Sequence, residues 1–149
     1  MHSASFLARP IAPRFWIPAL LYALLAGALT LAAAPSPEVA PRVTVNWDMV
    51  VQHGQWWRLL TGMLLHASFS HWIANMAYVL VFGMLLYGYF GWRLFPVASV
   101  VGGAVTHWLA LATYPGQLHL VGASGMVFVM MGMWLPLYWL TERHVQRFR

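Results

Sequence analysis

The 149-residue sequence contains no cysteine and no lysine, and it has only three acidic residues. Without cysteine, the chain can form neither a disulfide nor a thiolate metal site, and it has no cysteine nucleophile. Charged residues make up 7% of the sequence and hydrophobic residues 61%, a composition typical of membrane proteins. The eight arginines are scattered between apolar runs. A nucleic-acid-binding face needs clustered basic residues, so we expect a lipid environment and no nucleic-acid partner.

Four runs without a charged residue are long enough to cross a bilayer: residues 15–34, 72–90, 94–112 and 121–140. A helix of about 20 residues is about 30 Å long, which matches the hydrocarbon thickness. The first run could be a signal peptide, because Ala32-Ala33-Ala34 resembles a cleavage site, but it exceeds the ~7–15 apolar residues of such a segment. We therefore predict an all-α membrane protein with a single four-helix transmembrane domain over residues 1–149.

The segment between the first two runs, residues 43–70, is more polar. It contains Arg58 and the pair Trp56-Trp57, and its apolar stretch is too short to span. Tryptophan is enriched at the membrane–water interface. We predict a long interfacial or partly re-entrant loop, which a proline-rich turn at 35–41 connects to the first helix.

The distribution of arginine predicts the orientation. Four spans place both termini on one side of the membrane, and the side richer in arginine is cytoplasmic. The terminal side carries Arg9, Arg14, Arg93, Arg143, Arg147 and Arg149, whereas the other side carries only Arg42 and Arg58. We therefore expect cytoplasmic termini.

A run of small residues, Val121-Gly122-Ala123-Ser124-Gly125, precedes the last apolar stretch. The two glycines permit close approach of another backbone or of a substrate. A helix that starts here leaves backbone N–H groups free near Ser124, where they could stabilise an oxyanion. We predict that Ser124 is a nucleophile near the outer membrane face, about one turn inside the fourth helix. The alternative is a small residue that allows helices to pack closely.

His66, His71 and Asn75 form a second polar group. His71 and Asn75 are four residues apart, so they share one helical face at the outer end of the second span. Polar side chains at this depth are unfavourable unless they face the bundle interior or water. An imidazole and an amide beside Ser124 could stabilise an oxyanion, although they could instead join helices through hydrogen bonds. A metal site is disfavoured because no carboxylate or thiolate is near.

Between residues 55 and 134 the chain resembles the rhomboid family of intramembrane serine proteases. The resemblance rests on Trp57-Arg58, on His66-x4-His71-x3-Asn75, on Gly122-Ala123-Ser124-Gly125 and on Gly132, eight residues after the serine. It implies a cofactor-free endopeptidase of the bacterial inner membrane that cleaves transmembrane or membrane-adjacent protein substrates near the outer face.

The resemblance also implies roles for single residues. Ser124 would be the nucleophile, and its own N–H, His71 and Asn75 would stabilise the oxyanion. The supporting residues would be His66, Trp57, Arg58, Gly122 and Gly125, with Phe128 packed beside the catalytic histidine.

Two features depart from the family pattern. A buried glutamate of the family is replaced by Tyr87, which puts a local hydrogen-bond network in doubt. The family also has six helices and takes its general base from a histidine on the sixth, whereas this sequence ends 25 residues after Ser124. A serine without a base is a poor nucleophile. We therefore expect a C-terminally truncated rhomboid-like bundle, inactive alone, which needs its missing helices or a second chain.

Three other histidines are candidate substitute bases. His107 lies near the depth of Ser124, but a packed intramembrane histidine is the favoured interpretation. His144 lies at the opposite end of the last span, and His119 has no support to orient it. Two other functions stay open. One is a catalytically inactive rhomboid-like protein that binds transmembrane segments. The other is a transporter or channel subunit, but the apolar runs lack the acidic residues expected of a proton or ion path.

Overall fold

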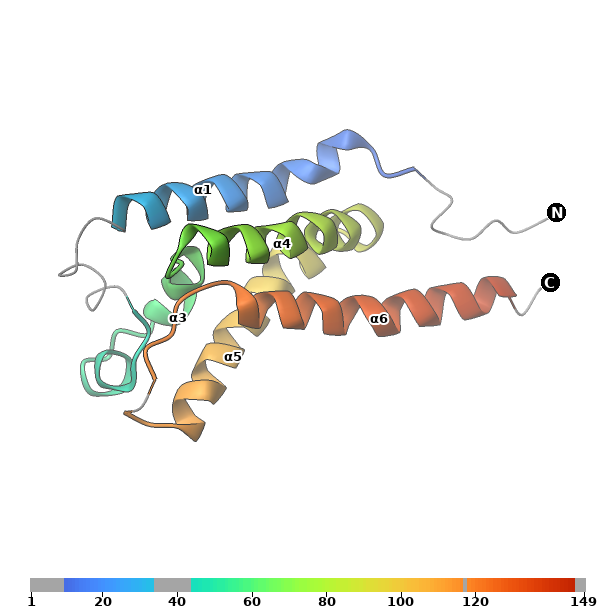
Figure 1. Cartoon of the computed structure of the whole chain (residues 1–149). Coiled ribbons are helices and arrows are strands. Elements are labelled where there is room, and N and C mark those ends of the chain that lie inside the picture. The colour runs from blue at the N-terminus through green and yellow to red at the C-terminus, as the bar shows by residue number, and fades with distance from the viewer. Residues whose placement is uncertain (1–9, 34–43, 117, 147–149) are drawn as a thin grey trace.

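The computed structural model describes residues 10–33, 44–116 and 118–146. Four helices in this part are long and apolar enough to cross a membrane, which confirms the predicted all-α membrane architecture. They pack as a bundle in which α5 crosses the other helices obliquely (Figure 1). The elements are η2 (Pro13–Trp16), α1 (Ile17–Ala33), η3 (Asp48–Gln52), α3 (Arg58–Thr61), η4 (Gly62–Leu64), α4 (Phe69–Phe90), η5 (Arg93–Ala98), α5 (Ser99–Thr113) and α6 (Ser124–Gln146).

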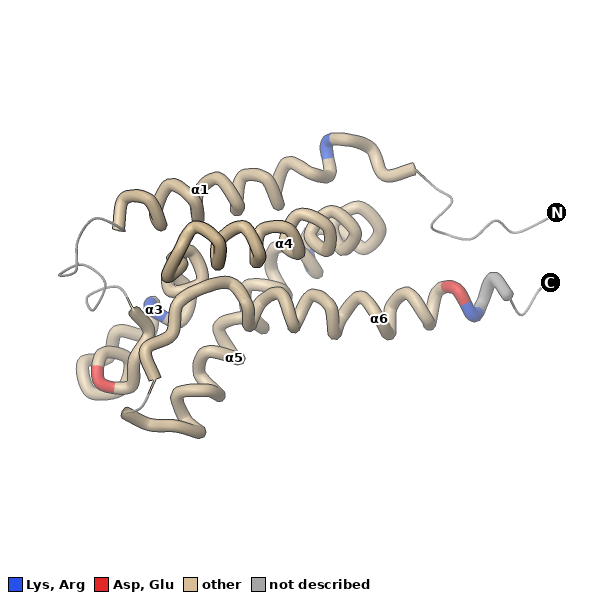
Figure 2. The backbone as a smooth tube through the Cα atoms, in the orientation of Figure 1, with Lys and Arg blue, Asp and Glu red and all other residues tan. Residues whose placement is uncertain are grey.

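The described charged residues are confined to the two ends of the bundle (Figure 2). Asp48 and Arg58 belong to the segment between α1 and α4, whereas the others lie at the opposite ends of the spans. The long middle of the bundle carries no charge, as a hydrocarbon environment requires. The proline-rich turn at 35–41 and four arginines used for orientation lie outside the described residues: Arg9, Arg42, Arg147 and Arg149.

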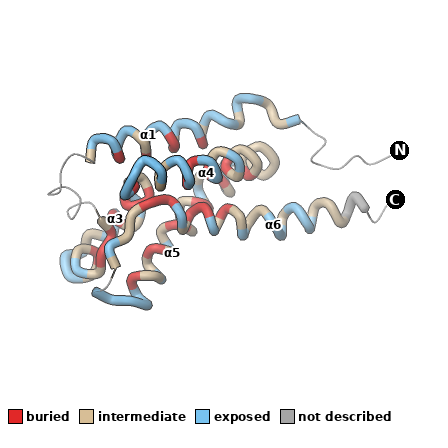
Figure 3. The backbone as a smooth tube through the Cα atoms, in the orientation of Figure 1, coloured by how far each residue is buried: buried red, intermediate tan, exposed pale blue. Residues whose placement is uncertain are grey.

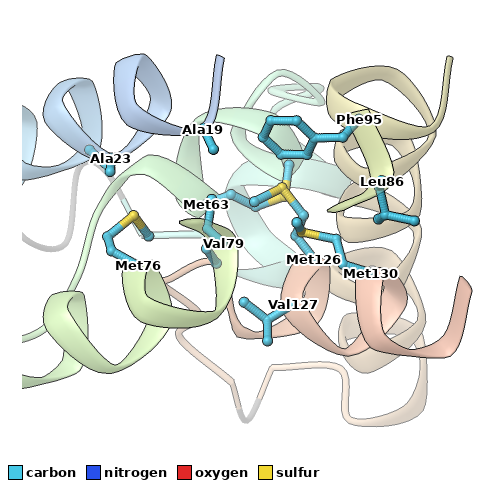
Figure 4. Close-up of a cluster of buried hydrophobic side chains, with 12 residues drawn as sticks. Ala19, Ala23, Met63, Met76, Val79, Leu86, Phe95, Met126, Val127 and Met130 are labelled. Carbon is cyan, nitrogen blue, oxygen red and sulfur yellow. The ribbon is translucent and has the colours of Figure 1, made fainter. Parts of the chain in front are cut away.

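The core lies where α1, α4, α5 and α6 face one another. Small residues of α1, such as Ala19 and Ala23, let α4 approach closely. Four methionines fill the irregular space between the interfacial segment, α4 and α6, where flexible thioethers pack well (Figure 4). They are Met63, Met76, Met126 and Met130. The outward faces are exposed and apolar, most extensively on α1 (Figure 3), which suits contact with lipid.

Residues 44–66 form the predicted non-spanning segment, built from η3, α3 and η4. Each turn is too short to cross a bilayer. Arg58 is buried, and its guanidinium donates to the Thr44 carbonyl at 3.0 Å and to the Gln55 side chain. Trp57 is 58% exposed. Tyr22 of α1 donates to the Met63 carbonyl at 2.9 Å, so the segment is also joined to the first span.

Several helix boundaries differ from the prediction. The third span was predicted from residue 94, but α5 begins at Ser99, because the backbone at Phe95, which precedes a proline, is not helical. Helix α4 begins at Phe69 rather than Trp72, because the Ser68 hydroxyl accepts the His71 N–H at 3.1 Å and caps the helix. Helix α6 begins at Ser124, so the serine occupies the first helical position and does not lie one turn inside. Helix α6 also continues through Pro136 to Gln146, six residues beyond the predicted end at residue 140.

Candidate active site

The residues before Ser124 are held by hydrogen bonds to the interfacial segment. Val45 and Leu120 exchange two backbone bonds, with N–O distances of 2.9 and 2.8 Å. The Gly122 N–H donates to the Gly62 carbonyl at 2.9 Å. These contacts join residues about 60 to 75 positions apart in sequence, and we call them the seam. The seam places the turn before Ser124 directly against α3 and η4.

His66 extends the seam to the beginning of α6. The Ala123 N–H donates to His66 Nε2 at 3.4 Å, and the Ala123 carbonyl accepts the Val127 N–H at 2.9 Å. Ala123 is therefore the N-cap residue of α6, and one of the four N–H groups without an intrahelical partner is satisfied by the imidazole. The Ser124 N–H belongs to the same first turn, whose N–H groups have no partner within the helix.

The environment of His66 favours the neutral imidazole that this contact needs. Burial first, and then the neighbouring His71, lower the pKa of His66 to about 4, although the Leu64 backbone opposes the shift. Among the described residues, its buried Nδ1 makes no hydrogen bond of ordinary geometry. If Nε2 carried a proton, its N–H would point at the Ala123 N–H. This repulsion would occur at the N-terminus of α6, where the helix dipole is positive and disfavours a cation.

His71 lies against the turn that precedes the serine. The cap at Ser68 fixes the first turn of α4, and the His71 ring meets the His66 ring edge-on with 5.1 Å between centroids. A side chain on Gly122 would come within 2.7 Å of His71 Cε1. Gly122 also has a φ of +105°, which glycine adopts without strain. The predicted partners His66, His71 and Gly122 are therefore in contact.

The serine itself is less enclosed than its neighbours. Ser124 is exposed, and its hydroxyl has no hydrogen-bond partner among the described residues. The Asn75 side chain is buried and donates to the His71 carbonyl in its own helix at 2.9 Å. Phe128, one turn after Ser124, is 70% exposed, and no described histidine ring packs on it. The structure thus assembles the two histidines and the turn, but it does not link them to the hydroxyl.

Sequence reasoning missed several residues that form this site. Gly62 accepts the Gly122 N–H, and Thr106 of α5 occupies the space where a side chain on Gly125 would lie. Ser68 could have been found, because a serine three positions before His71 matches an N-cap signal. The described residues contain no group of three or more His, Asp or Glu side chains arranged to hold a metal ion.

A family model described as the Rhomboid domain matches residues 53–149. The chain belongs to the rhomboid family. Every residue predicted for the site lies within the matched rhomboid region. No solved structure matches the chain at a significant level.

Three curated relatives support the rhomboid assignment. "Putative rhomboid protease YdcA" of Bacillus subtilis (strain 168) is 33% identical over 90 residues, 60% of this chain and 45% of the relative. "RHOMBOID-like protein 6, mitochondrial" of Arabidopsis thaliana is 37% identical over 61% of this chain and 29% of the relative. "Rhomboid-like protease 2" of Toxoplasma gondii is 25% identical over 68% of this chain and 36% of the relative. The chain thus spans less than half of the length of each of these three relatives.

Proposed function

We propose that this rhomboid-family protein is an intramembrane serine endopeptidase, with Ser124 as the nucleophile. The observation that carries the proposal is the position of Ser124 at the first residue of α6, directly after a turn packed on His71 and His66. A helix N-terminus supplies a free N–H beside the attacking oxygen. We assign oxyanion stabilisation to this N–H together with the side chains of His71 and Asn75. Two relatives carry "protease" in their names.

We assign none of the described histidines as the base that accepts the proton of the Ser124 hydroxyl. No described segment covers the face of α6 that carries the serine, where Phe128 is 70%, Leu135 64% and Trp139 59% exposed. We propose that a further transmembrane segment, from a longer chain or a second chain, packs on this face and supplies the base. A transmembrane substrate would approach Ser124 along the same end of the bundle.

We also propose that the serine end of the bundle faces away from the cytoplasm, in a bacterial inner membrane. Support comes from the arginines of the spans: Arg14, Arg93 and Arg143 lie at the end opposite to Ser124, whereas Arg58 lies at the serine end. Arginine favours the cytoplasmic side. Cleavage would then occur near the outer face.

A second candidate function is a catalytically inactive rhomboid-like protein that binds transmembrane segments. The observation that favours it is the exposed hydroxyl of Ser124, which has no hydrogen-bond partner within the described part of the chain. A serine in such a protein needs no base, whereas a nucleophile does.

Labelling with a fluorophosphonate in native membranes separates the two candidates. The protease predicts a covalent adduct that mass spectrometry locates on Ser124 and that Ser124→Ala abolishes. It also predicts cleavage of a reporter with a transmembrane segment by the wild type but not by Ser124→Ala. Absence of both, with photo-crosslinking of the reporter retained in Ser124→Ala, would overturn the protease and support the binding protein.

A further inference from the structure

His107 is a buried polar side chain in a membrane-spanning helix. It lies in α5, is 6% exposed, and has its Nδ1 3.1 Å from the Leu59 carbonyl oxygen. A carbonyl oxygen only accepts, so Nδ1 carries the proton in this contact. Because a polar group in the membrane is unfavourable without such a partner, its position in the fold calls for an explanation.

The ring of His107 lies against the interfacial side of the seam. Leu59 belongs to α3 in the interfacial segment, and its carbonyl is the hydrogen-bond partner of the imidazole. Gly62, whose carbonyl accepts the Gly122 N–H, lies next to His107: a Cβ on Gly62 would be 3.7 Å from His107 Cε1. A single side chain of α5 therefore contacts the interfacial segment at the place where Gly62 bonds to the turn in front of Ser124.

We propose that His107 is a positioning residue, whose imidazole holds the Leu59 carbonyl beside the Gly62–Gly122 backbone bond and thereby fixes the location of Ser124. The role in catalysis rests on the proposed protease function, whereas the fixing of the turn does not. His107 acts through the backbone and takes no proton from the serine. The seam alone consists of backbone bonds between two loops, and His107 attaches that junction to a transmembrane helix.

Three substitutions test the position of the donor. His107→Asn keeps an N–H near the place of Nδ1, His107→Gln moves the N–H outward to the place of Nε2, and His107→Leu removes it. The matched control is His119→Leu, an exposed histidine in the segment that leads to the same turn. The readout is hydrogen exchange of the Gly122 and Ala123 amides in the full protein in nanodiscs.

We expect the amides to exchange about tenfold faster in His107→Leu and His107→Gln, the effect of losing one buried hydrogen bond. Exchange in His107→Asn and in His119→Leu should stay within about twofold of the wild type. If the Leu variant fails to accumulate, the comparison of Asn with Gln decides alone. Unchanged exchange in Leu, or equal exchange in Asn and Gln, would overturn the proposal.

The rate of fluorophosphonate labelling then connects the turn to chemistry. His107→Asn should retain most of the labelling rate, whereas His107→Gln should lose it in proportion to the faster exchange. A histidine acting as general base would lose activity in both variants, which separates that role from positioning. If the wild type is not labelled at all, the protease function fails, while the exchange experiment still decides whether His107 fixes the turn.

Discussion

At the scale of single residues, Gly122 is the position where backbone and side-chain constraints coincide. Its φ is +105°, and an added Cβ would come within 2.7 Å of the His71 ring. Gly116 is a matched control, because its φ is +77° but a Cβ would meet nothing within 4 Å. Substituting alanine at either position imposes backbone strain of about 1–2 kcal/mol, and only at Gly122 does it add overpacking of about 1–3 kcal/mol.

We therefore predict that Gly122→Ala lowers the free energy of unfolding more than Gly116→Ala does, by at least about 1 kcal/mol. Reversible unfolding in mixed micelles, followed by tryptophan fluorescence, measures both variants. Equal losses would mean that His71 does not pack on the turn as described. Fluorophosphonate labelling should also fall in Gly122→Ala and persist in Gly116→Ala.

His66 gives the site a dependence on pH. Its pKa is about 4 in the folded protein against an ordinary value of 6.5, so between these values the unfolded chain binds the proton more readily. Stability is therefore fully present above about pH 6.5 and is lost as the pH falls towards 4. We predict that the unfolding midpoint decreases over this interval.

The variant His66→Gln isolates this effect. A glutamine oxygen can accept the Ala123 N–H but does not titrate, so the unfolding midpoint should change less between pH 7.5 and pH 5 than in the wild type. The exposed His119→Gln serves as the control and should keep the wild-type profile. An identical pH dependence in His66→Gln and the wild type would assign the effect to another group.

At the scale of elements, the N-terminal cap of α4 determines where His71 lies. The Ser68 hydroxyl accepts the His71 N–H, and the Ser68 carbonyl accepts the Trp72 N–H. We predict that Ser68→Ala destabilises the protein by about 1 kcal/mol and speeds exchange of the His71 amide. Ser70→Ala is the control, because Ser70 contacts the Ser68 hydroxyl but caps nothing. Similar exchange in both variants would show that the cap does not hold the first turn.

The elements themselves were largely predictable, because a span depends on local composition. Uncharged runs of sufficient length identify the four helices without knowledge of their neighbours. Their ends were less predictable, since a single hydrogen bond at Ser68 extends α4 by three residues. The spacing of His71 and Asn75 correctly placed them on one helix. It could not reveal that the Asn75 amide donates to the His71 carbonyl, because this depends on a side-chain rotamer.

The seam was beyond sequence reasoning for a different reason. It consists mainly of backbone groups, which every residue possesses, so no pattern distinguishes Gly62 or Leu120 as a partner. The interpretation of His107 as a packed histidine agrees with its burial. The depth of a residue along a helix, however, does not specify in which direction around the helix axis its side chain points. Only packing of α5 against α3 turns the imidazole towards Leu59.

At the scale of the whole molecule, the absence of cysteine makes the proposed orientation directly measurable. Asp48 lies in the interfacial segment at the serine end, and Arg93 lies in the turn between α4 and α5 at the other end. Both are exposed, and neither belongs to the proposed catalytic group. Asp48→Cys and Arg93→Cys each place one thiol in a protein that otherwise has none.

In bacterial spheroplasts, a membrane-impermeant maleimide should label Asp48→Cys at once and Arg93→Cys only after permeabilisation. The physical reason is that arginine is retained on the cytoplasmic side, so the end that keeps Arg14 and Arg143 in both variants stays inside. The reverse pattern would place Ser124 at the cytoplasmic face, and cleavage near the outer face would then be untenable. Labelling of both thiols before permeabilisation would mean that the chain inserts in two orientations, as expected if the arginine bias is too weak to decide between them.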